Sequence, residues 1–242
     1  LDQSMVNQIV QATSERRNIF GAVFYFSSGD KSIDILSASG NIEPESQYYI
    51  ASINKLFISS ILLRLYAGKQ IELNNKISTY LPEKVVRGLH IHKGKDYSKD
   101  LTIAHLLSHT SGLPCYLLDP QADGKKVMAE LEAGIDQSWP IDKVIQAVKR
   151  MKTHFPPGRE GKAKYSDTNY QVLSLVIENI TGFPVQIVLN NLFQELNLTQ
   201  TYVFEDIHDK SFVPIYYKSE QRKLPLFLSS TRNDIISTAR DQ

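Results

Sequence analysis

Apolar residues are most concentrated between positions 53 and 66, and this segment sets the first expectation about the fold. The segment is too long for an ordinary strand, and its apolar side chains point almost all round a helix, so it predicts a buried helix. Gly68 follows and is expected to end the helix in the left-handed conformation, which costs glycine little. Because Arg64 interrupts the apolar run, the run falls short of the roughly 18 residues that a membrane span needs, and we expect no such span.

The region before this helix predicts a β-hairpin. Apolar residues partly alternate with small or polar ones in Ile19–Ser27 and again in Ser32–Ser39. The connection between these runs contains Gly29 and Asp30, which tolerate the dihedral angles of a turn. Residues 2–17 are polar with scattered apolar positions and predict a surface helix. Two strands do not make a stable sheet by themselves, so this is the weak point of a mixed α/β fold.

The rest of the chain is expected to be mostly helix and loop. Thr102 can cap a short helix that runs to Ser108, and Ser111-Gly112-Leu113-Pro114 then breaks it. The polar stretch Leu81–Asp100 predicts a long surface loop. Further helices are expected at Lys125–Ala133, Ile141–Met151, Thr168–Thr181, Pro184–Glu195 and, as a helix start, Thr231–Arg240.

Composition narrows the class of protein. The chain has 242 residues, 42% hydrophobic and 22% charged, enough for one large domain or two small ones with an apolar core. A net charge of +1 gives no electrostatic reason to expect nucleic acid or an anionic membrane as partner. The single cysteine, Cys115, excludes an internal disulfide. With no signal peptide visible after Leu1, we expect a soluble globular protein.

Two Ser-x-x-Lys matches contain candidate nucleophiles, and their context separates them. Ser28 and Lys31 lie on the predicted hairpin turn, where neither side chain would be buried or oriented. Ser52 instead opens the predicted buried helix, and Lys55 follows one turn later on the same face. A serine hydroxyl becomes a good nucleophile only when a neighbouring base takes its proton, and a helix N-terminus can stabilise an oxyanion. Burial would also disfavour a charged lysine and lower its pKa.

A second candidate is the triplet Tyr165-Ser166-Asp167, just before a predicted helix. Tyr165 could relay a proton if a nearby cation lowered its pKa, and an acid two residues on could orient a lysine. Both candidates also have a purely structural interpretation. Ser52 could cap a core helix while Lys55 extends to its surface, and Tyr165 could be a half-buried aromatic with Asp167 as an N-cap. On spacing alone these alternatives stay open.

The histidines raise the question of a metal site. His105 and His109 have the spacing of two zinc ligands on a helix. Leu106 occupies the position where zinc peptidases have glutamate, and no third ligand is evident, so packing is the favoured interpretation. His90 and His92 lie in the predicted polar loop and are expected to be solvated. We expect neither a metal nor a cofactor.

In their order and spacing, four stretches resemble the serine β-lactamase and penicillin-binding protein superfamily. The closest group is the class C-type one, which includes β-lactamase-like esterases and D-amino-acid peptidases. Each motif is weak alone, but the four together favour a catalytic interpretation of Ser52. The stretches are Ile50–Phe57 with its Ser-x-x-Lys, Leu101–Pro114 with His-Thr-Ser-Gly-Leu-Pro, Tyr165–Tyr170, and Gly68–Leu73 leading to Tyr80–Glu83.

The resemblance implies roles for individual residues. Ser52 would be the nucleophile that forms an acyl-enzyme, and its backbone N–H would be half of the oxyanion hole. Lys55 would be a general base and Tyr165 a general acid and base. Asp167 would support the active site, and Tyr116, in the loop that borders the cleft, would contact substrate.

Two departures from the family pattern matter. Asp167 stands where many members have Asn, and a carboxylate near Lys55 would favour its charged form and make it a poorer base. Deprotonation would then shift towards Tyr165, or the optimum pH would rise. No Lys-Thr-Gly or His-x-Gly follows Tyr165, although the family has this third motif on a strand near its C-terminus. We therefore expect a continuation of the chain, or a second polypeptide, to supply about three strands and a closing helix.

The resemblance also implies a fold and an activity. Residues 1–242 would form the N-terminal and central part of one β-lactamase-like domain, an antiparallel sheet flanked by helices plus a mostly helical subdomain. Residues 1–67 would hold the hairpin and nucleophile helix, and residues 68–242 the mostly helical region. We expect a serine hydrolase that acts through an acyl-enzyme on a β-lactam, D-amino-acid peptide or carboxylic ester.

A second interpretation stays open beside that of a serine hydrolase. The alternative from another class is a non-catalytic ligand sensor or scaffold, which Asp167 and the absent third motif would favour. The expected partner is a small-molecule or peptide substrate. Members that act on cell-wall peptides are exported while esterase-like relatives can be cytoplasmic, so export is slightly favoured.

Overall fold

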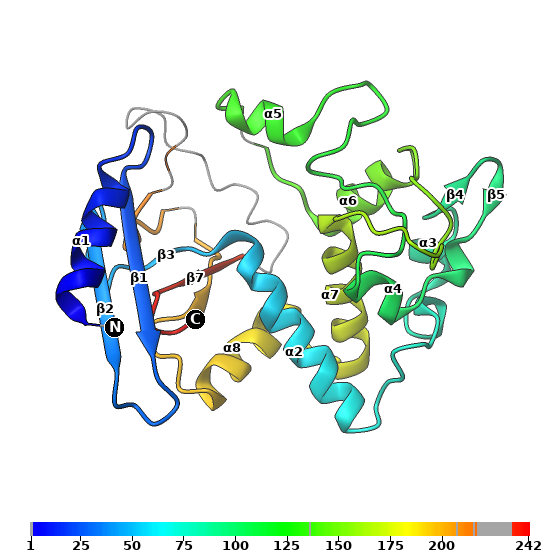
Figure 1. The fold of residues 1–242 in the computed structure, drawn as a ribbon. Coiled ribbons are helices and arrows are strands. Elements are labelled where there is room, and N and C mark those ends of the chain that lie inside the picture. Colours follow the sequence, from blue (N-terminus) through cyan, green and yellow to red (C-terminus); the bar gives the residue numbers. More distant parts are fainter. Residues whose placement is uncertain (1, 136, 207, 215, 217–233) are drawn as a thin grey trace.

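The computed structural model describes residues 2–135, 137–206, 208–214, 216 and 234–242. A β-hairpin with one helix against it lies on one side, a group of helices lies on the other, and α2 (Asn54–Ala67) runs between them (Figure 1). The other helices are α1 (Gln3–Ser14), α3 (Glu83–Val86), α4 (Ile103–Leu107), α5 (Val127–Glu132), α6 (Ile141–Val148), α7 (Asp167–Thr181) and α8 (Val185–Glu195). The strands are β1 (Gly21–Ser27), β2 (Asp34–Gly40), β3 (Tyr48–Tyr49), β4 (Ile91–His92), β5 (Lys95–Asp96), β6 (Tyr202–Val203) and β7 (Ile235–Ser237). The mixed α/β prediction is confirmed.

The N-terminal hairpin forms as the alternating pattern predicts. Strands β1 and β2 pair antiparallel, in a register that places Ala22 opposite Ser39. Helix α1 covers one face of this pair, because Val6 and Val10 on its inner side pack against Ile35 of β2. This face is only partly covered: Phe24 and Phe26 of β1 remain about 40% exposed.

A second sheet corrects the prediction of a helix start at Thr231–Arg240. Strand β7 lies between β3 and β6 and pairs antiparallel with both. Ile235 and Ile236 are fully buried, and two successive β-branched residues suit a strand that is covered on both faces. The local sequence could not reveal this, because both partner strands lie far away along the chain. Residues 231–233 of the predicted helix lie outside the described residues.

Helix α2 matches its predicted span, but it is not buried all round. Ile58 and Leu62 are fully enclosed, whereas Leu56 is 57% exposed and Leu63 is 50% exposed. The exposed residues lie one heptad apart and so share one face of the helix. The core therefore buries only part of the apolar surface of α2.

Helix α2 ends at Gly68 as predicted, but Gly68 is not the left-handed residue. Gly68 ends the helix with an ordinary negative φ of −77°. The left-handed residue is Lys69, whose φ is 58°. Backbone hydrogen bonds from Gly68 to the carbonyl of Arg64 and from Gln70 to that of Leu65 complete the final turn.

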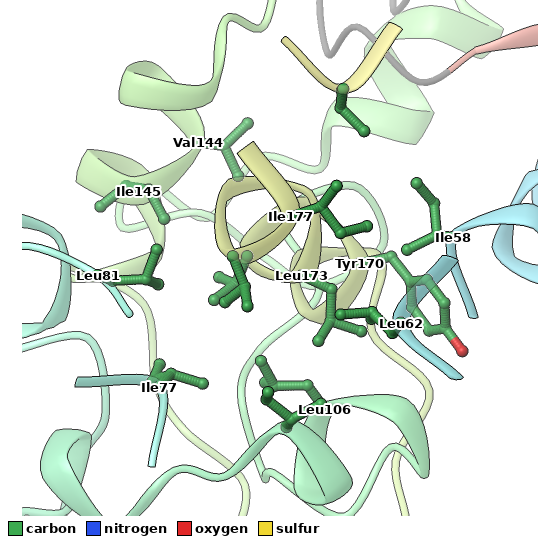
Figure 2. Packing of buried hydrophobic residues seen from close by; sticks show 14 of the residues in the cluster. Ile58, Leu62, Ile77, Leu81, Leu106, Val144, Ile145, Tyr170, Leu173 and Ile177 are labelled. Atoms are coloured by element: carbon green, nitrogen blue, oxygen red, sulfur yellow. The ribbon is translucent and has the colours of Figure 1, made fainter. Parts of the chain in front are cut away.

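The main core surrounds α7, which packs against α2 and α4 (Figure 2). Leu173 and Ile177 of α7 are fully buried beside Leu62 of α2 and Leu106 of α4. This packing fixes the first turn of α7 relative to the first turn of α2. Among the described residues no single helix is long and apolar enough to cross a membrane; the bent pair α7 and α8, at 82° to each other, meets that criterion by length and composition alone.

The segment Leu81–Asp100 is more ordered than the surface loop that its polarity predicts. It contains α3 and the short β4–β5 hairpin. Leu89 and His90 are buried, and the Nε2 atom of His90 lies 3.0 Å from the carbonyl oxygen of Phe155. The expectation of a solvated His90 is therefore wrong, because the apolar residues around it draw it into the core. His92 is partly buried, with its Nδ1 atom 3.1 Å from the hydroxyl of Thr153.

The Gly112 turn brings the chain close to itself beside the site. Gly112 has a φ of +72°, and a Cβ atom there would lie 1.9 Å from the backbone oxygen of Phe155. Only glycine fits this close approach without displacement of the backbone. The break that was predicted at this motif is thus required by packing as well as by the turn. It directs the following residues, from Leu113 on, towards the first turn of α7.

Candidate active site

Ser52 lies in a short 3-10 turn, Ala51–Ile53, that leads directly into α2. It does not cap the helix: Ile53 holds the N-cap position, where no side-chain hydrogen bond forms. Ala51 has a φ of +48°, a left-handed conformation that a residue with a Cβ atom rarely adopts. Such strain beside an exposed hydroxyl is a frequent feature of functional sites.

Four side chains from two helices meet at Ser52. The Lys55 Nζ atom lies 3.2 Å from the Ser52 Oγ atom and 2.6 Å from an Asp167 carboxylate oxygen. The Tyr165 hydroxyl lies 2.7 Å from the Ser52 Oγ atom and donates a 2.9 Å hydrogen bond to that same carboxylate oxygen. Lys55 lies in the first turn of α2 and Ser52 in the 3-10 turn just before it, while Asp167 begins α7 and Tyr165 lies two residues earlier. The structure thus brings together the residues that the motifs single out.

These four side chains form a closed ring of contacts, and the donor and acceptor of each hydrogen bond in it can be assigned. The tyrosine has one hydroxyl proton, and that proton points at the carboxylate of Asp167. The Ser52 hydroxyl is therefore the donor in its contact with the Tyr165 oxygen, while Lys55 donates to the Ser52 oxygen. The Ser52 hydroxyl therefore already contacts both side chains that could take part in moving its proton.

Burial is uneven across the ring. Tyr165 is 39% exposed and the Ser52 side chain is also exposed, whereas the side chains of Lys55 and Asp167 are 14% and 13% exposed. The two hydroxyl groups are therefore accessible to a substrate, and the ion pair lies behind them. The Lys55 ammonium also lies 5.3 Å from the centre of the Tyr165 ring, within the range of a cation–π contact.

The Asp167 carboxylate controls the charge of Lys55. Burial opposes the charged ammonium, but the negative charge and hydrogen bond of Asp167 outweigh it, so the pKa of Lys55 is raised above its ordinary value. Burial raises the pKa of Tyr165 as well, although hydrogen bonds with Lys55 and Ser52 oppose this effect. At neutral pH the ring therefore holds a charged lysine and a neutral phenol.

Cys115 also contacts the site, although no sequence motif identifies it. Its thiol lies 3.3 Å from the second carboxylate oxygen of Asp167 and accepts the backbone N–H of Asp167 at 3.4 Å. Burial, with the Asp167 charge beside it, raises the pKa of the Cys115 thiol to about 12. The thiol is thus a neutral donor that orients Asp167 rather than a nucleophile.

Tyr116 lies beside the site but beneath its surface. Its side chain is 3% exposed and packs against Trp139, with the ring centres 5.7 Å apart. Its backbone N–H bonds to the hydroxyl of Thr168 in the first turn of α7. Contact between Tyr116 and a substrate stays a prediction, and in this structure the residue serves to anchor the loop.

The two histidines with zinc-like spacing have separate structural partners. The His105 ring occupies the capping box of α4, where its Nδ1 atom accepts the backbone N–H of Thr102. His109 faces Tyr165 instead, with ring centres 4.7 Å apart. Among the described residues, no group of three or more His, Cys, Asp or Glu side chains could hold a metal ion.

Comparisons with known proteins show what this chain is similar to. A putative D-alanyl-D-alanine carboxypeptidase of Salmonella agona (strain SL483) is 33% identical over 173 residues, which are 70% of this chain and 36% of that protein. An N-acetylmuramyl-L-alanine amidase of Bacillus subtilis (strain 168) is 24% identical over 232 residues, 94% of this chain and 48% of that protein. The chain therefore spans less than half the length of these two relatives.

A solved structure extends the similarity to the fold. A D-stereospecific amidohydrolase from Streptomyces sp. superposes with a TM-score of 0.81 and 26% sequence identity, covering 100% of this chain and 71% of that one. The family model named Beta-lactamase matches residues 6–242, which include both helices that build the site. On this match, the chain belongs to the Beta-lactamase family.

Proposed function

We propose that this protein is a serine hydrolase that forms an acyl-enzyme at Ser52 with an amide or ester substrate. The observation that carries the proposal is the closed ring in which the exposed Ser52 hydroxyl donates to Tyr165 and accepts from Lys55. A structural serine would need neither contact. The non-catalytic alternative has no comparable observation in its favour.

The ring supplies the proton transfers that acyl transfer needs. In the form of the protein with a neutral Lys55, the Ser52 oxygen attacks the substrate carbonyl carbon, its proton passes to the Lys55 amine, and the carbonyl oxygen becomes an oxyanion. Tyr165 then donates a proton to the leaving nitrogen or oxygen as its bond to the carbonyl carbon breaks. Water attacks the resulting ester and gives its proton to the same groups, which frees Ser52 and releases the acid.

Amides or peptides of D-amino acids are the substrate class we favour. The curated relative at 33% identity is described as a putative D-alanyl-D-alanine carboxypeptidase, and the structural neighbour at 26% as a D-stereospecific amidohydrolase. Both descriptions name the D configuration. A comparison of D- and L-alanine p-nitroanilide as substrates would decide this point, and faster turnover of the L form would contradict it.

Covalent labelling tests the central proposal. Incubation with a fluorescent penicillin and, separately, a fluorophosphonate is expected to give an adduct on Ser52, located by peptide mass spectrometry. Ser52→Ala should abolish the label. Ser28→Ala is the matched control, because Ser28 belongs to the other Ser-x-x-Lys sequence but bonds within the hairpin turn, to Asp30. Failure of both probes to label Ser52 in a folded protein would favour the non-catalytic alternative.

We further propose that additional strands complete the β1–β2 sheet, either from a continuation of this chain or from a second polypeptide. Among the described residues β1 pairs only with β2, and its Phe24 and Phe26 side chains remain about 40% exposed. A hollow of about 390 Å³ lies along β1, lined among others by Val23, Tyr48 and Tyr49. A folded monomer with the intact mass of these 242 residues and full activity would contradict this proposal.

A further inference from the structure

His109 lies directly behind the Tyr165 phenol, although neither its motif nor its spacing gives it a part in the proposed reaction. It follows α4 with a φ of +58°, and its backbone oxygen accepts the N–H of Lys164 at 2.9 Å. The backbone at His109 thus joins the end of α4 to the segment that enters Tyr165. A left-handed conformation at a residue other than glycine persists only where its surroundings hold it there.

The His109 ring accepts two hydrogen bonds at one nitrogen. The backbone N–H of Ser166 donates to its Nδ1 atom at 3.2 Å, and the side-chain amide of Asn169 lies 3.0 Å from the same atom. The amide is oriented by the Ser111 hydroxyl, which donates to its oxygen at 2.7 Å, so that its NH₂ group faces the ring. A backbone N–H can only donate, so Nδ1 must carry a lone pair and the neutral ring must carry its proton on Nε2.

The faces of the His109 ring contact the same tyrosines that surround Lys55. The ring centre lies 4.7 Å from that of Tyr165 and 5.4 Å from that of Tyr170. The Lys55 ammonium lies 5.3 Å and 5.5 Å from these two tyrosine rings. His109 therefore restrains Tyr165 in two ways, through its ring and through the backbone of the next residue.

We infer that His109 is a positioning residue, which holds the Tyr165 phenol between Ser52 and Asp167 only while its imidazole ring is neutral. The inference rests on the proposed function and adds a second proton-dependent step to it. Protonation would place a hydrogen on Nδ1, break both hydrogen bonds there, and bring a second cation close to Lys55. Tyr165 would then lose the restraint that aligns it with Ser52.

The charges around His109 influence the pH at which Tyr165 would lose this restraint. The groups that face it are Lys55 from α2, and Tyr165, Asp167 and Tyr170 from the start of α7. Burial lowers the pKa of His109 and the positive charge of Lys55 adds to this, while Asp167 partly opposes both. The pKa of His109 is therefore lower than that of an ordinary histidine, and the ring is neutral at physiological pH.

The pH dependence of turnover tests this inference, with p-nitrophenyl acetate as the probe. Loss of a neutral Lys55 gives log(kcat/KM) a slope of one as pH falls, and the slope is expected to steepen to two in the acidic range where His109 becomes protonated. His109→Phe keeps an aromatic ring but no acceptor, and should lower kcat by about 10- to 100-fold with KM nearly unchanged. His109→Gln retains an acceptor and should recover part of kcat. Both variants should keep a slope of one throughout.

Two measurements distinguish positioning from simple packing. The matched control is His105→Gln, which changes a histidine in the α4 capping box and should retain the steeper slope. Nitrogen-15 NMR of the wild-type protein at pH 8 is expected to show His109 as the Nε2–H tautomer. An Nδ1–H tautomer, or a slope of two retained in both His109 variants, would overturn the inference. A wild-type protein that neither labels at Ser52 nor hydrolyses the ester would instead contradict the proposed function, while the tautomer would still decide the hydrogen-bond pattern of His109.

Discussion

Replacement of Lys55 by Met is expected to lower the rate of acylation at Ser52 by about 10²- to 10⁴-fold, the usual contribution of a general base. Methionine has a similar length and fills the same space, but it cannot donate to the Ser52 oxygen or pair with Asp167. The rate constant for labelling by a fluorophosphonate measures this step directly. Because the remaining carboxylate would lose its cation, the melting temperature should be recorded alongside the rate.

The second Ser-x-x-Lys sequence provides the control for this substitution. Lys31 lies on the exposed hairpin turn, so Lys31→Met should leave the labelling rate unchanged. A Lys55→Met protein that remains folded and labels at the wild-type rate would show that Lys55 does not act as the base. Tyr165 would then be the remaining candidate for that role.

Replacement of Asp167 by Asn is expected to lower the pKa of Lys55, because it removes a carboxylate from contact with the ammonium. In the wild-type protein Asp167 raises the pKa of Lys55 despite its burial, which leaves little neutral amine at pH 7. Without that charge, a larger fraction of Lys55 is neutral at a given pH. The acidic limb of kcat/KM should therefore move to lower pH, and activity at neutral pH should rise.

A pH–rate profile from pH 5 to pH 10 checks this expectation. Asp119→Asn is the matched control, because Asp119 pairs with His154 and Lys164 instead of Lys55. That variant should retain the wild-type limb. If Asp167→Asn leaves the profile in place, the charge of Asp167 does not govern the base. The departure from the family's Asn would then have another cause.

Sequence patterns predict best where structure depends on neighbours along the chain. The β1–β2 hairpin follows from alternation on both sides of a turn, and α7 follows from a long apolar periodicity that ends at Gly182. Strand β7 is missed because its hydrogen-bond partners, β3 and β6, lie far away in the chain. A short apolar run has no periodicity of its own from which a strand could be distinguished from a helix.

The candidate site shows the same contrast between features set by neighbours along the chain and features set by distant residues. Motif spacing places Ser52 and Lys55 one turn apart, the resemblance adds Tyr165, and the structure brings these three side chains together. The contacts of Cys115 with Asp167 and of His109 with Ser166 arise only when the Gly112 turn meets the start of α7. The sequence around Cys115 and His109 contains no pattern that predicts these contacts. Their contribution becomes visible only in three dimensions.

Ser52 and Tyr165 are separated by 113 positions along the chain, and they lie just before two helices, α2 and α7, that pack together in the main core. A nascent or partly melted chain therefore carries an ordinary alcohol at position 52, with the weak reactivity of any free serine. On the proposed function, we expect reactivity at Ser52 only once the core has closed around α7. An unfinished polypeptide would then need no separate inhibitor to keep it from attacking esters or amides.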